Sequence, residues 1–214
     1  MRHHGTVVDQ PQDRTTRTRQ MLLDAAEVMF AEHGIASVSN RQISEAAGQG
    51  NNYAVGYHFG TKTELVRAIL HHHSVRLDEI RARITAEVGE EADIRDWLRC
   101  LIQPQVEYLG TLRRPSHFAR FCVQVASEPT MANLLYEEAF ASEAISRILD
   151  GFYGALPGLP AGAVEVRDLI TRNSIIVTLA DLERALNGEE APDWRALCEA
   201  MIDAMVGMWS APAS

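Results

Sequence analysis

The chain has 214 residues, of which 46% are hydrophobic and 23% charged, and its formal net charge is −9. This composition excludes collagen-like, disordered and disulfide-rich proteins and is typical of a globular protein of one or two domains. Residues 1–70 carry seven basic and seven acidic side chains, so the whole net negative charge falls on residues 71–214. Because negative charge repels phosphate, any nucleic-acid contact is expected in the first 70 residues.

The sequence lacks the signals that would direct the chain into a membrane or out of the cell. It contains no run of about 18 apolar residues, and residues 1–20 are too polar for the apolar region of a secretory signal. We therefore expect a cytoplasmic protein with no membrane partner. The three cysteines, Cys100, Cys122 and Cys198, lie far apart with no CxxC spacing, so we expect buried free thiols rather than disulfides or a zinc site.

The hydrophobic pattern predicts helices from the start of the chain. Apolar residues recur three and four positions apart, and convincing strand alternation is absent, so the prediction is an all-α protein. A first helix is expected over residues 16–33, with Gly34 as the residue that ends it. Ser39 and Gln42 form a capping box, which starts a short second helix that stops at Gly48.

The next segment predicts a turn and two more helices. The residues from Gly48 to Asn52 include four that tolerate positive φ, which indicates a sharp turn. A short third helix fits residues 52–59. A second capping box, at residues 61–64, starts a long fourth helix that runs to about residue 89.

The remaining chain is also predicted to be helical. Further helices are expected at residues 94–111, 116–127, 131–152, 162–187 and 192–209. Pro104 is expected to kink or divide the first of these. Residues 154–160, rich in glycine and proline, form the clearest predicted loop.

The two short helices have the pattern of a helix-turn-helix. This motif consists of two short helices joined by a tight turn and packed on a longer one, and its second helix enters the major groove of DNA. The helix at residues 52–59 is mostly polar or flat, and only Ala54, Val55 and Phe59 are left to hold it in a core. Asparagine pairs with adenine, and tyrosine and histidine reach phosphates or base edges. We therefore interpret this helix as the DNA-reading element.

Three stretches of this region resemble the N-terminal domain of TetR-family transcriptional regulators. They are Leu22-x-x-Ala25-Ala26-x-x-Met29-Phe30-x-x-x-Gly34, Ser39-x-Arg41-x-Ile43-Ser44-x-Ala46-Ala47-Gly48 and Tyr57-His58-Phe59-Gly60-Thr61-Lys62-x-Glu64-Leu65. The resemblance covers about residues 15–66. It implies an all-helical homodimer with a three-helix DNA-binding domain and a C-terminal domain that binds a small effector and dimerises.

Two features depart from the family pattern. One additional residue lies between Gly48 and Tyr57, and Gly56 stands where family members usually have tyrosine. The additional residue lengthens the turn or shifts the start of the reading helix. The missing ring removes one customary phosphate contact.

The resemblance, carried over residue by residue, implies a set of DNA-binding side chains. Those expected to contact the phosphate backbone are Tyr57, His58 and Lys62, which is the single lysine of the chain. Further candidates for the backbone or the groove are Arg41 and Gln49. The candidates for base reading are Asn51, Asn52 and Tyr53. For Tyr53, packing against the first helix remains the alternative.

The predicted organisation has four parts. They are a flexible N-terminal arm (1–14), a helix-turn-helix DNA-binding domain (15–60), a connecting helix (61–89) and a helical ligand-binding and dimerisation domain (90–211). Thr15, Arg17 and Arg19 are expected at the start of the first helix, where backbone amides and guanidinium groups can hold a phosphate.

The middle helices supply candidates for a ligand pocket. Pockets are mostly apolar with a few polar anchors, and the candidates that fit this description are Trp97, Phe118, Phe121, Gln124, Tyr136 and Phe140. Arg120, one turn before Gln124, is a second possible anchor. The alternative is that the aromatic residues are simply the core of a helical domain.

The last two predicted helices carry wide apolar stripes, which are expected to pack on each other and on a second copy of the chain. The residues expected at this dimer interface are Leu169, Ile176, Ala180, Trp194, Met201 and Met205. Periodicity alone does not separate an interface from an internal core.

Other chemistry has little support in the sequence. Adjacent residues on a helix point about 100° apart, so the triplet at residues 71–73 is not expected to hold a metal ion. His73 falls on an apolar stripe and is expected to be a core histidine with satisfied hydrogen bonds. No GxSxG, HExxH, Walker or GxGxxG motif occurs, so we expect neither an enzyme nor a cofactor.

The sequence therefore predicts a DNA-binding transcriptional regulator. The specific hypothesis is a homodimeric repressor that a small apolar or aromatic effector releases from a palindromic operator. The alternative is a helical ligand-binding or interaction module that no longer binds DNA. The additional turn residue, Gly56 and the zero net charge of residues 1–70 favour this alternative.

Overall fold

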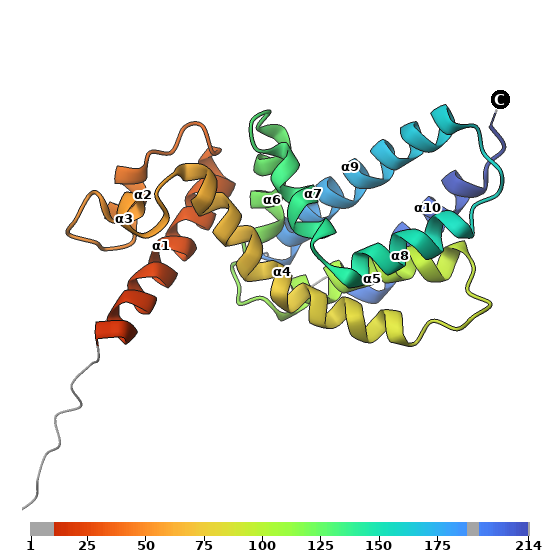
Figure 1. Cartoon of the computed structure of the whole chain (residues 1–214), viewed down its shortest axis with the longest axis horizontal. Coiled ribbons are helices and arrows are strands. Elements are labelled where there is room, and N and C mark those ends of the chain that lie inside the picture. The colour runs from red at the N-terminus through yellow and green to blue at the C-terminus, as the bar shows by residue number, and fades with distance from the viewer. Residues whose placement is uncertain (1–10, 188–192, 214) are drawn as a thin grey trace, which may run out of the picture.

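The computed structural model describes residues 11–187 and 193–213, and every regular element within them is an α-helix (Figure 1). The prediction of an all-α fold is confirmed. The helices are α1 (Pro11–His33), α2 (Asn40–Ala46), α3 (Ala54–Phe59), α4 (Lys62–Ala86), α5 (Ile94–Thr111), α6 (Phe118–Ser127), α7 (Ala132–Phe140), α8 (Glu143–Gly154), α9 (Ala161–Leu186) and α10 (Trp194–Ser210). Helices α1 to α3 form one end of the molecule, and α4 leads from them into the remaining helices (Figure 1).

Local sequence signals set the ends of the first helices. The Ser39–Gln42 capping box is present, with the Gln42 N–H donating to Ser39 Oγ and the Ser39 N–H donating to Gln42 Oε1. Gly34 follows α1 at φ +82°, a conformation that glycine adopts without steric cost. Thr61 Oγ1 accepts the Glu64 N–H and caps α4.

Helix α1 begins earlier than the hydrophobic pattern indicates. It starts at Pro11, because a proline is well suited to the first turn of a helix, where its missing N–H has no partner to lose. The expectation of a flexible arm is therefore wrong for residues 11–14, and the rest of that predicted arm, residues 1–10, lies outside the described residues. Arg17 and Arg19 lie inside the helix rather than at its start, so the expected phosphate site at the helix start, which included Thr15, is also wrong.

Two predictions for the C-terminal helices need correction. The single helix expected over residues 131–152 is two helices, because Ser142 accepts the Ile145 N–H and caps the start of α8. Pro104 does not divide α5, which continues to Thr111. A proline removes one intrahelical hydrogen bond, and packing on α4, α8 and α10 holds the two halves of α5 together.

The short helix α3 depends on its neighbours for its position. Ala54, Val55 and Phe59 are buried, as the sequence predicted, and they pack into the same core as α1, α2 and α4. This arrangement leaves the remaining side chains of α3 on the surface.

Helix α6 joins the two parts of the molecule. It packs on α9 along one side and on α1 along the other. Phe121 of α6 is fully buried, and its ring stacks on that of Phe30 in α1 with the centroids 6.2 Å apart. Helices α1 to α3 and the C-terminal helices therefore share a continuous core.

The remaining sequence predictions concern thiols and membranes. Cys100, Cys122 and Cys198 are free, and burial raises the pKa of each thiol, that of Cys198 to about 11. The prediction of free thiols is confirmed. None of the helices in the described part of the chain is both long and apolar enough to cross a membrane.

Candidate DNA-binding surface and ligand cavity

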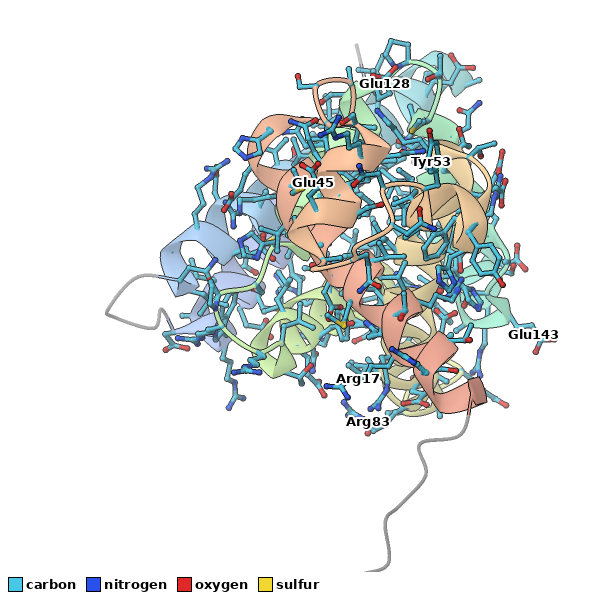
Figure 2. All side chains as sticks on the ribbon, turned by 90° about the vertical axis from the view of Figure 1, so that its left-hand side faces the viewer. Arg17, Glu45, Tyr53, Arg83, Glu128 and Glu143 are labelled. Atoms are coloured by element: carbon cyan, nitrogen blue, oxygen red, sulfur yellow. The ribbon has the colours of Figure 1, made fainter. Side chains whose placement is uncertain are left out.

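The end of the molecule formed by α1, α2 and α3 exposes aromatic and amide side chains. Tyr53 and Tyr57 are 82% and 81% exposed, and Asn52 is also exposed. Figure 2 looks onto this end, with Tyr53 labelled on the surface. The alternative that Tyr53 packs against the first helix is therefore wrong. The ring of His58 lies edge-on to that of Tyr57, with the centroids 5.0 Å apart.

Hydrogen bonds of Asn51 shape the turn before α3. Asn51 Oδ1 accepts the Tyr53 N–H at 2.9 Å, and the Asn51 carbonyl accepts the Ala54 N–H at 3.0 Å. Gly48 has a φ of +66°, which begins the turn. Asn51, a candidate for base reading, thus uses its amide oxygen to shape the turn.

Lys62 has a structural role that its place in the motif did not indicate. Its Nζ donates to the backbone carbonyls of Ile35 at 3.0 Å and Val38 at 2.6 Å, in the segment between α1 and α2. The side chain is half-buried. Lys62 therefore ties the start of α4 to the loop before the helix-turn-helix, and a contact between its ammonium group and phosphate stays a prediction.

The two remaining candidates of the DNA-binding set make local contacts. Arg41 pairs with Glu45 at 2.8 Å, and the hydrogen bond from this carboxylate raises the pKa of Arg41. Gln49 Nε2 donates to the Ala47 carbonyl at 3.0 Å. The structure thus brings all eight candidates to one end of the molecule, while their contacts with DNA remain predictions.

The contacts of Lys62 give a testable prediction for stability. Replacement of Lys62 by methionine should lower the free energy of unfolding by about 2 kcal/mol, because two partly buried carbonyls lose a charged donor. Urea denaturation measures this change. Arg41→Met is the matched control, since it removes an exposed cation and should change stability by less than about 0.5 kcal/mol. Equal stability of the two variants would contradict the structural role.

A cavity of about 520 Å³ lies between helices α4 to α9. Most of its lining is apolar, and the aromatic residues among the lining are Tyr108, Phe118, Tyr136, Phe140, Phe152 and Tyr153. A volume of this size is typical of sites for small organic ligands. Three of the six pocket candidates, Phe118, Tyr136 and Phe140, line this cavity.

The other three candidates lie elsewhere, which corrects the predicted pocket. Trp97 packs against Gly151 of α8, so closely that a Cβ at Gly151 would lie 2.3 Å from its ring. Phe121 is buried against α1, as described above. Gln124 lines a separate hollow with Glu32 of α1 and Arg184 of α9. Helix α6 is buried on two sides, and Phe121 and Gln124 lie on the side that faces away from the cavity.

The sequence analysis missed a cavity residue on α4. Arg81 lines the cavity and is 4% exposed. Its signal is its position on the apolar stripe of the helix, four residues after Leu77 and three before Ile84. Such a residue is more commonly a surface side chain, so the pattern alone did not single it out.

His73 connects the cavity wall to helix α1. It is buried on α4, with Nδ1 2.6 Å from the Tyr108 hydroxyl and Nε2 2.7 Å from Glu27 Oε2 of α1. Its ring stacks on Phe118 with the centroids 3.8 Å apart. The prediction of a satisfied core histidine is confirmed. Both Tyr108 and Phe118 also line the cavity, so a chain of direct contacts leads from the cavity to α1.

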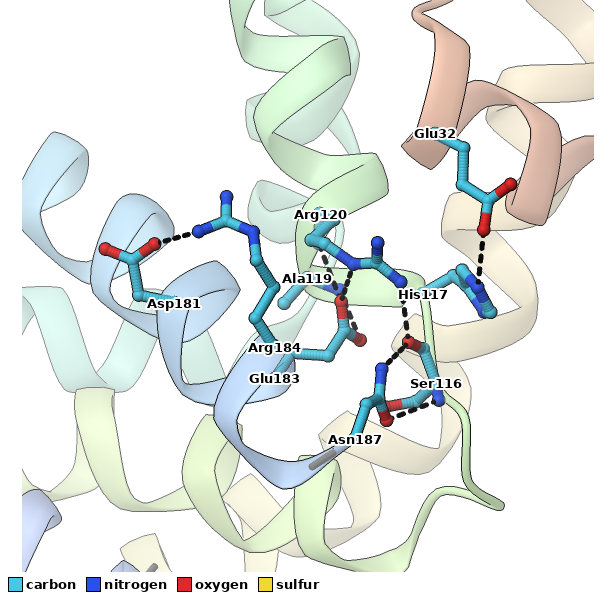
Figure 3. A network of polar contacts seen from close by, with 9 residues as sticks. All are labelled: Glu32, Ser116, His117, Ala119, Arg120, Asp181, Glu183, Arg184 and Asn187. Carbon is cyan, nitrogen blue, oxygen red and sulfur yellow. Dashed lines mark hydrogen bonds and ion pairs between the residues drawn. The ribbon is translucent and has the colours of Figure 1, made fainter. Parts of the chain in front are cut away.

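A polar network holds the start of α6 against α9 (Figure 3). The carboxylate of Glu183 is fully buried and accepts the backbone N–H groups of Ala119 and Arg120 at 3.1 and 3.0 Å. Asn187 Nδ2 donates to the Ser116 carbonyl at 2.8 Å. Arg120 pairs with Glu183 at 3.4 Å and does not line the cavity, so the expectation that it anchors a ligand there is wrong.

The residues expected at a dimer interface divide into two groups. Ala180 and Met205 are buried in the internal core, and Ile176 lines the cavity, because these residues face neighbouring helices of the same chain. Leu169 is 50% exposed, and Trp194 and Met201 are half-buried. The exposed large apolar residues of α9 are Val166, Leu169, Ile170 and Val177, which lie on one face of the helix.

Comparison with known sequences decides the family. Residues 22–69 match the family described as bacterial regulatory proteins, tetR family, and residues 99–208 match the tetracyclin repressor-like C-terminal domain. The chain belongs to the TetR family. Its α2 and α3 are the helix-turn-helix of the TetR DNA-binding domain, and α5 to α10 lie mainly in the TetR C-terminal domain.

Among curated TetR relatives is the HTH-type transcriptional repressor AcnR of Corynebacterium glutamicum. It is 35% identical over 91 residues, which are 40% of this chain and 48% of AcnR. The AcnR of Corynebacterium efficiens is 30% identical over 91 residues, again 40% of this chain and 48% of that protein. This chain therefore matches about half the length of these repressors.

Solved TetR-family structures share the fold over most of the chain. A TetR family transcription regulator from Marinobacter aquaeolei has a TM-score of 0.61 at 17% identity, covering 92% of this chain and 97% of that one. LfrR from Mycobacterium smegmatis, crystallised with proflavine, has a TM-score of 0.54 at 20% identity, covering 91% and 97%. At these identities the likeness shows the fold alone.

Proposed function

We propose that this TetR-family chain is a homodimeric repressor that binds a palindromic operator and is released from it by a small apolar or aromatic effector in the cavity. Binding of operator DNA implies that it acts in the cytoplasm. The observation that carries the proposal is the position of His73. It contacts Tyr108 and Phe118 of the cavity lining on one side and Glu27 of α1 on the other. Through these contacts, a change in the cavity wall can alter the position of the DNA-binding domain.

The surface of α3 supports the DNA-binding part of the proposal. Asn52, Tyr53 and Tyr57 are exposed at the end of the molecule, where no other helix of the described chain covers them. Amide and phenol side chains read base edges and phosphates in the major groove. The neutral charge of residues 1–70 predicts weak non-specific attraction to DNA, so affinity must come from specific contacts.

The exposed face of α9 supports the homodimer. A contiguous apolar face on a soluble protein is typical of an interaction surface, and Val166, Leu169, Ile170 and Val177 form such a face. Two copies related by a twofold axis cover this face with itself. The two α3 helices of that dimer would read a palindrome with half-sites about one DNA turn apart.

The effector acts in this proposal by a shift between two conformations. The face of α4 that includes Leu70, Ser74 and Leu77 lines the cavity, and the same helix starts at the helix-turn-helix. A ligand that favours a tilted α4 changes the spacing of the two reading helices and lowers affinity for the operator. Bound proflavine in LfrR is consistent with an aromatic effector in a cavity of this fold.

Selection from a random-sequence DNA duplex pool at about 0.15 M salt tests the proposal. The expected result is enrichment of a palindromic motif. The variant Asn52→Ala/Tyr57→Ala should lose this enrichment but keep the native melting temperature, since both side chains are exposed. Val75→Ala, at an exposed apolar residue of α4, is the control that should select the same motif.

Failure to enrich any sequence with folded protein would overturn the DNA-binding part. It would favour the alternative of a ligand-binding module that has lost DNA binding. A non-palindromic motif would instead contradict the twofold dimer and leave α3 as the reading helix.

A further inference from the structure

A cationic side chain lies buried in the wall of the cavity. Arg81 is 4% exposed, and its only described carboxylate partner is Asp78, which accepts from Nη1 at 2.7 Å. Among the described residues, its Nε is buried without a hydrogen-bond partner. A buried donor without a partner costs free energy, and more so when it carries charge. Arg81 therefore places a buried positive charge in the wall of the cavity, balanced among the described residues by Asp78 alone.

The chemistry of the guanidinium group of Arg81 indicates which ligand group suits it. The guanidinium group is a planar fork, and Nε and Nη2 present two parallel N–H groups along one edge. Asp78 bonds to Nη1, at the other side of the fork. A carboxylate that reaches the guanidinium group from the cavity gains charge-assisted hydrogen bonds. Burial lowers the pKa of Arg81, and the hydrogen bond with Asp78 and its negative charge act in the opposite direction.

The acidic residues of the lining have different surroundings. Glu138 accepts hydrogen bonds from Ser74 Oγ at 2.6 Å, and its Oε1 lies 2.8 Å from His71 Nδ1. Asp168 accepts from the Tyr153 hydroxyl at 2.8 Å, and Glu165 is exposed. These carboxylates have hydrogen-bond partners or contact solvent, whereas the charge of Arg81 is buried with Asp78 as its one described carboxylate partner. The cavity therefore favours an anionic ligand group over a cationic one.

We propose that the cavity binds an apolar molecule that ends in a carboxylate, and that the carboxylate pairs with the guanidinium group of Arg81. The proposal rests on the effector-binding role proposed above and adds the chemical class of the effector. The apolar part of the molecule lies against the aliphatic and aromatic lining, for example Leu101, Leu149 and Phe152. Both an aliphatic acid and an aromatic acid meet this description.

Three probes that share one chain and differ in the head group test the proposal. They are decanoate, 1-decanol and decyltrimethylammonium, each used below its micelle concentration with the full chain. Calorimetric titration should show that decanoate binds at least tenfold more tightly than either other probe. Arg81→Met should remove this preference and leave the Kd of 1-decanol within about threefold of the native value.

Arg83→Met is the matched control on the same helix. Arg83 is 52% exposed and pairs with Glu107, so its loss should leave decanoate binding unchanged. Arg81→Met is expected to fold, because an apolar side chain of similar length replaces a buried charge, and its melting temperature checks this. If Arg81→Met does not fold, Arg81→Lys keeps the charge without the fork and should lose most of the decanoate preference.

Equal binding of decanoate and 1-decanol, or tighter binding of the cation, would overturn the carboxylate proposal. Undiminished preference for decanoate in Arg81→Met would overturn the assignment to Arg81. These failures differ from failure of the proposed function. In that case a probe binds in the cavity while operator affinity stays the same, or no operator is found at all.

Discussion

Replacement of Glu183 by alanine should lower the free energy of unfolding by about 3–5 kcal/mol. The carboxylate is fully buried and accepts two backbone N–H groups at the start of α6 as well as the Arg120 guanidinium. Alanine leaves Ala119 N–H and Arg120 N–H in the interior without an acceptor. The guanidinium, whose side chain is only 19% exposed, also loses its ion-pair partner. Chemical denaturation followed by circular dichroism measures the loss.

Asp181 on the same helix provides the matched control. Its ion pair with Arg184 is exposed on both sides, at 61% for each side chain, so Asp181→Ala should cost less than about 1 kcal/mol. Glu183→Gln keeps one acceptor oxygen and should fall between the two alanine variants. If Glu183→Ala were as stable as Asp181→Ala, the buried carboxylate would not be what holds α6 to α9.

The features of the fold that sequence predicted correctly are local ones. The Ser39–Gln42 capping box and the glycine after α1 depend on residues within one helical turn of each other. The Ser142 cap is also local and was overlooked because the apolar pattern continues across it. In features of this kind the residues in contact are also close in sequence, so their spacing along the chain predicts the contact directly.

The features that sequence did not predict join distant segments. Lys62 bonds to carbonyls 24 and 27 residues earlier, and Glu183 caps a helix that begins more than 60 residues before it. Such tertiary contacts replace a local cap, since α6 has no side-chain hydrogen bond from its own N-cap residue, His117. No periodicity marks them, because the pairing depends on how the helices pack.

The ligand cavity was half predicted for a related reason. Helix α6 has one wide apolar face that includes both Phe118 and Phe121, so the two residues look alike in the sequence. The structure places the first in the cavity wall and the second against Phe30 of α1. Hydrophobic periodicity indicates burial, but it does not distinguish packing against another helix from packing around a space.

Loss of the His73 network, which is the set of contacts of His73 with Tyr108, Phe118 and Glu27, should uncouple ligand binding in the cavity from operator binding. In the native protein, a saturating cavity ligand should weaken operator binding by about 5–150-fold. In His73→Phe/Glu27→Leu, the same ligand should change it by less than about twofold. Phenylalanine keeps a ring to stack on Phe118, while leucine removes the carboxylate that would otherwise remain buried without a partner. Operator titrations with and without the decyl probe that binds most tightly measure both values.

His72→Phe is the matched control for this experiment. His72 neighbours His73 on α4 but is exposed, so its replacement should leave the coupling at the native value. The double variant must still bind both DNA and the probe, because neither His73 nor Glu27 lines the cavity or belongs to the exposed surface of α3.

If the cavity ligand weakens operator binding in the double variant as much as in the native protein, a different contact transmits the effect of the ligand. Two other connections are present in the structure. One is the packing of α4 itself on α1 and α3, and the other is the packing of α6 between α9 and α1, where Phe121 stacks on Phe30 and His117 lies 3.5 Å from Glu32. A ligand shifts a conformational equilibrium only by its differential affinity for the two states. The His73 network therefore transmits the signal only if its hydrogen bonds differ between the two states. The hydrogen bond from His73 to Glu27 directly joins α4, which lines the cavity, to α1, so it is the contact most directly altered by a tilt of α4.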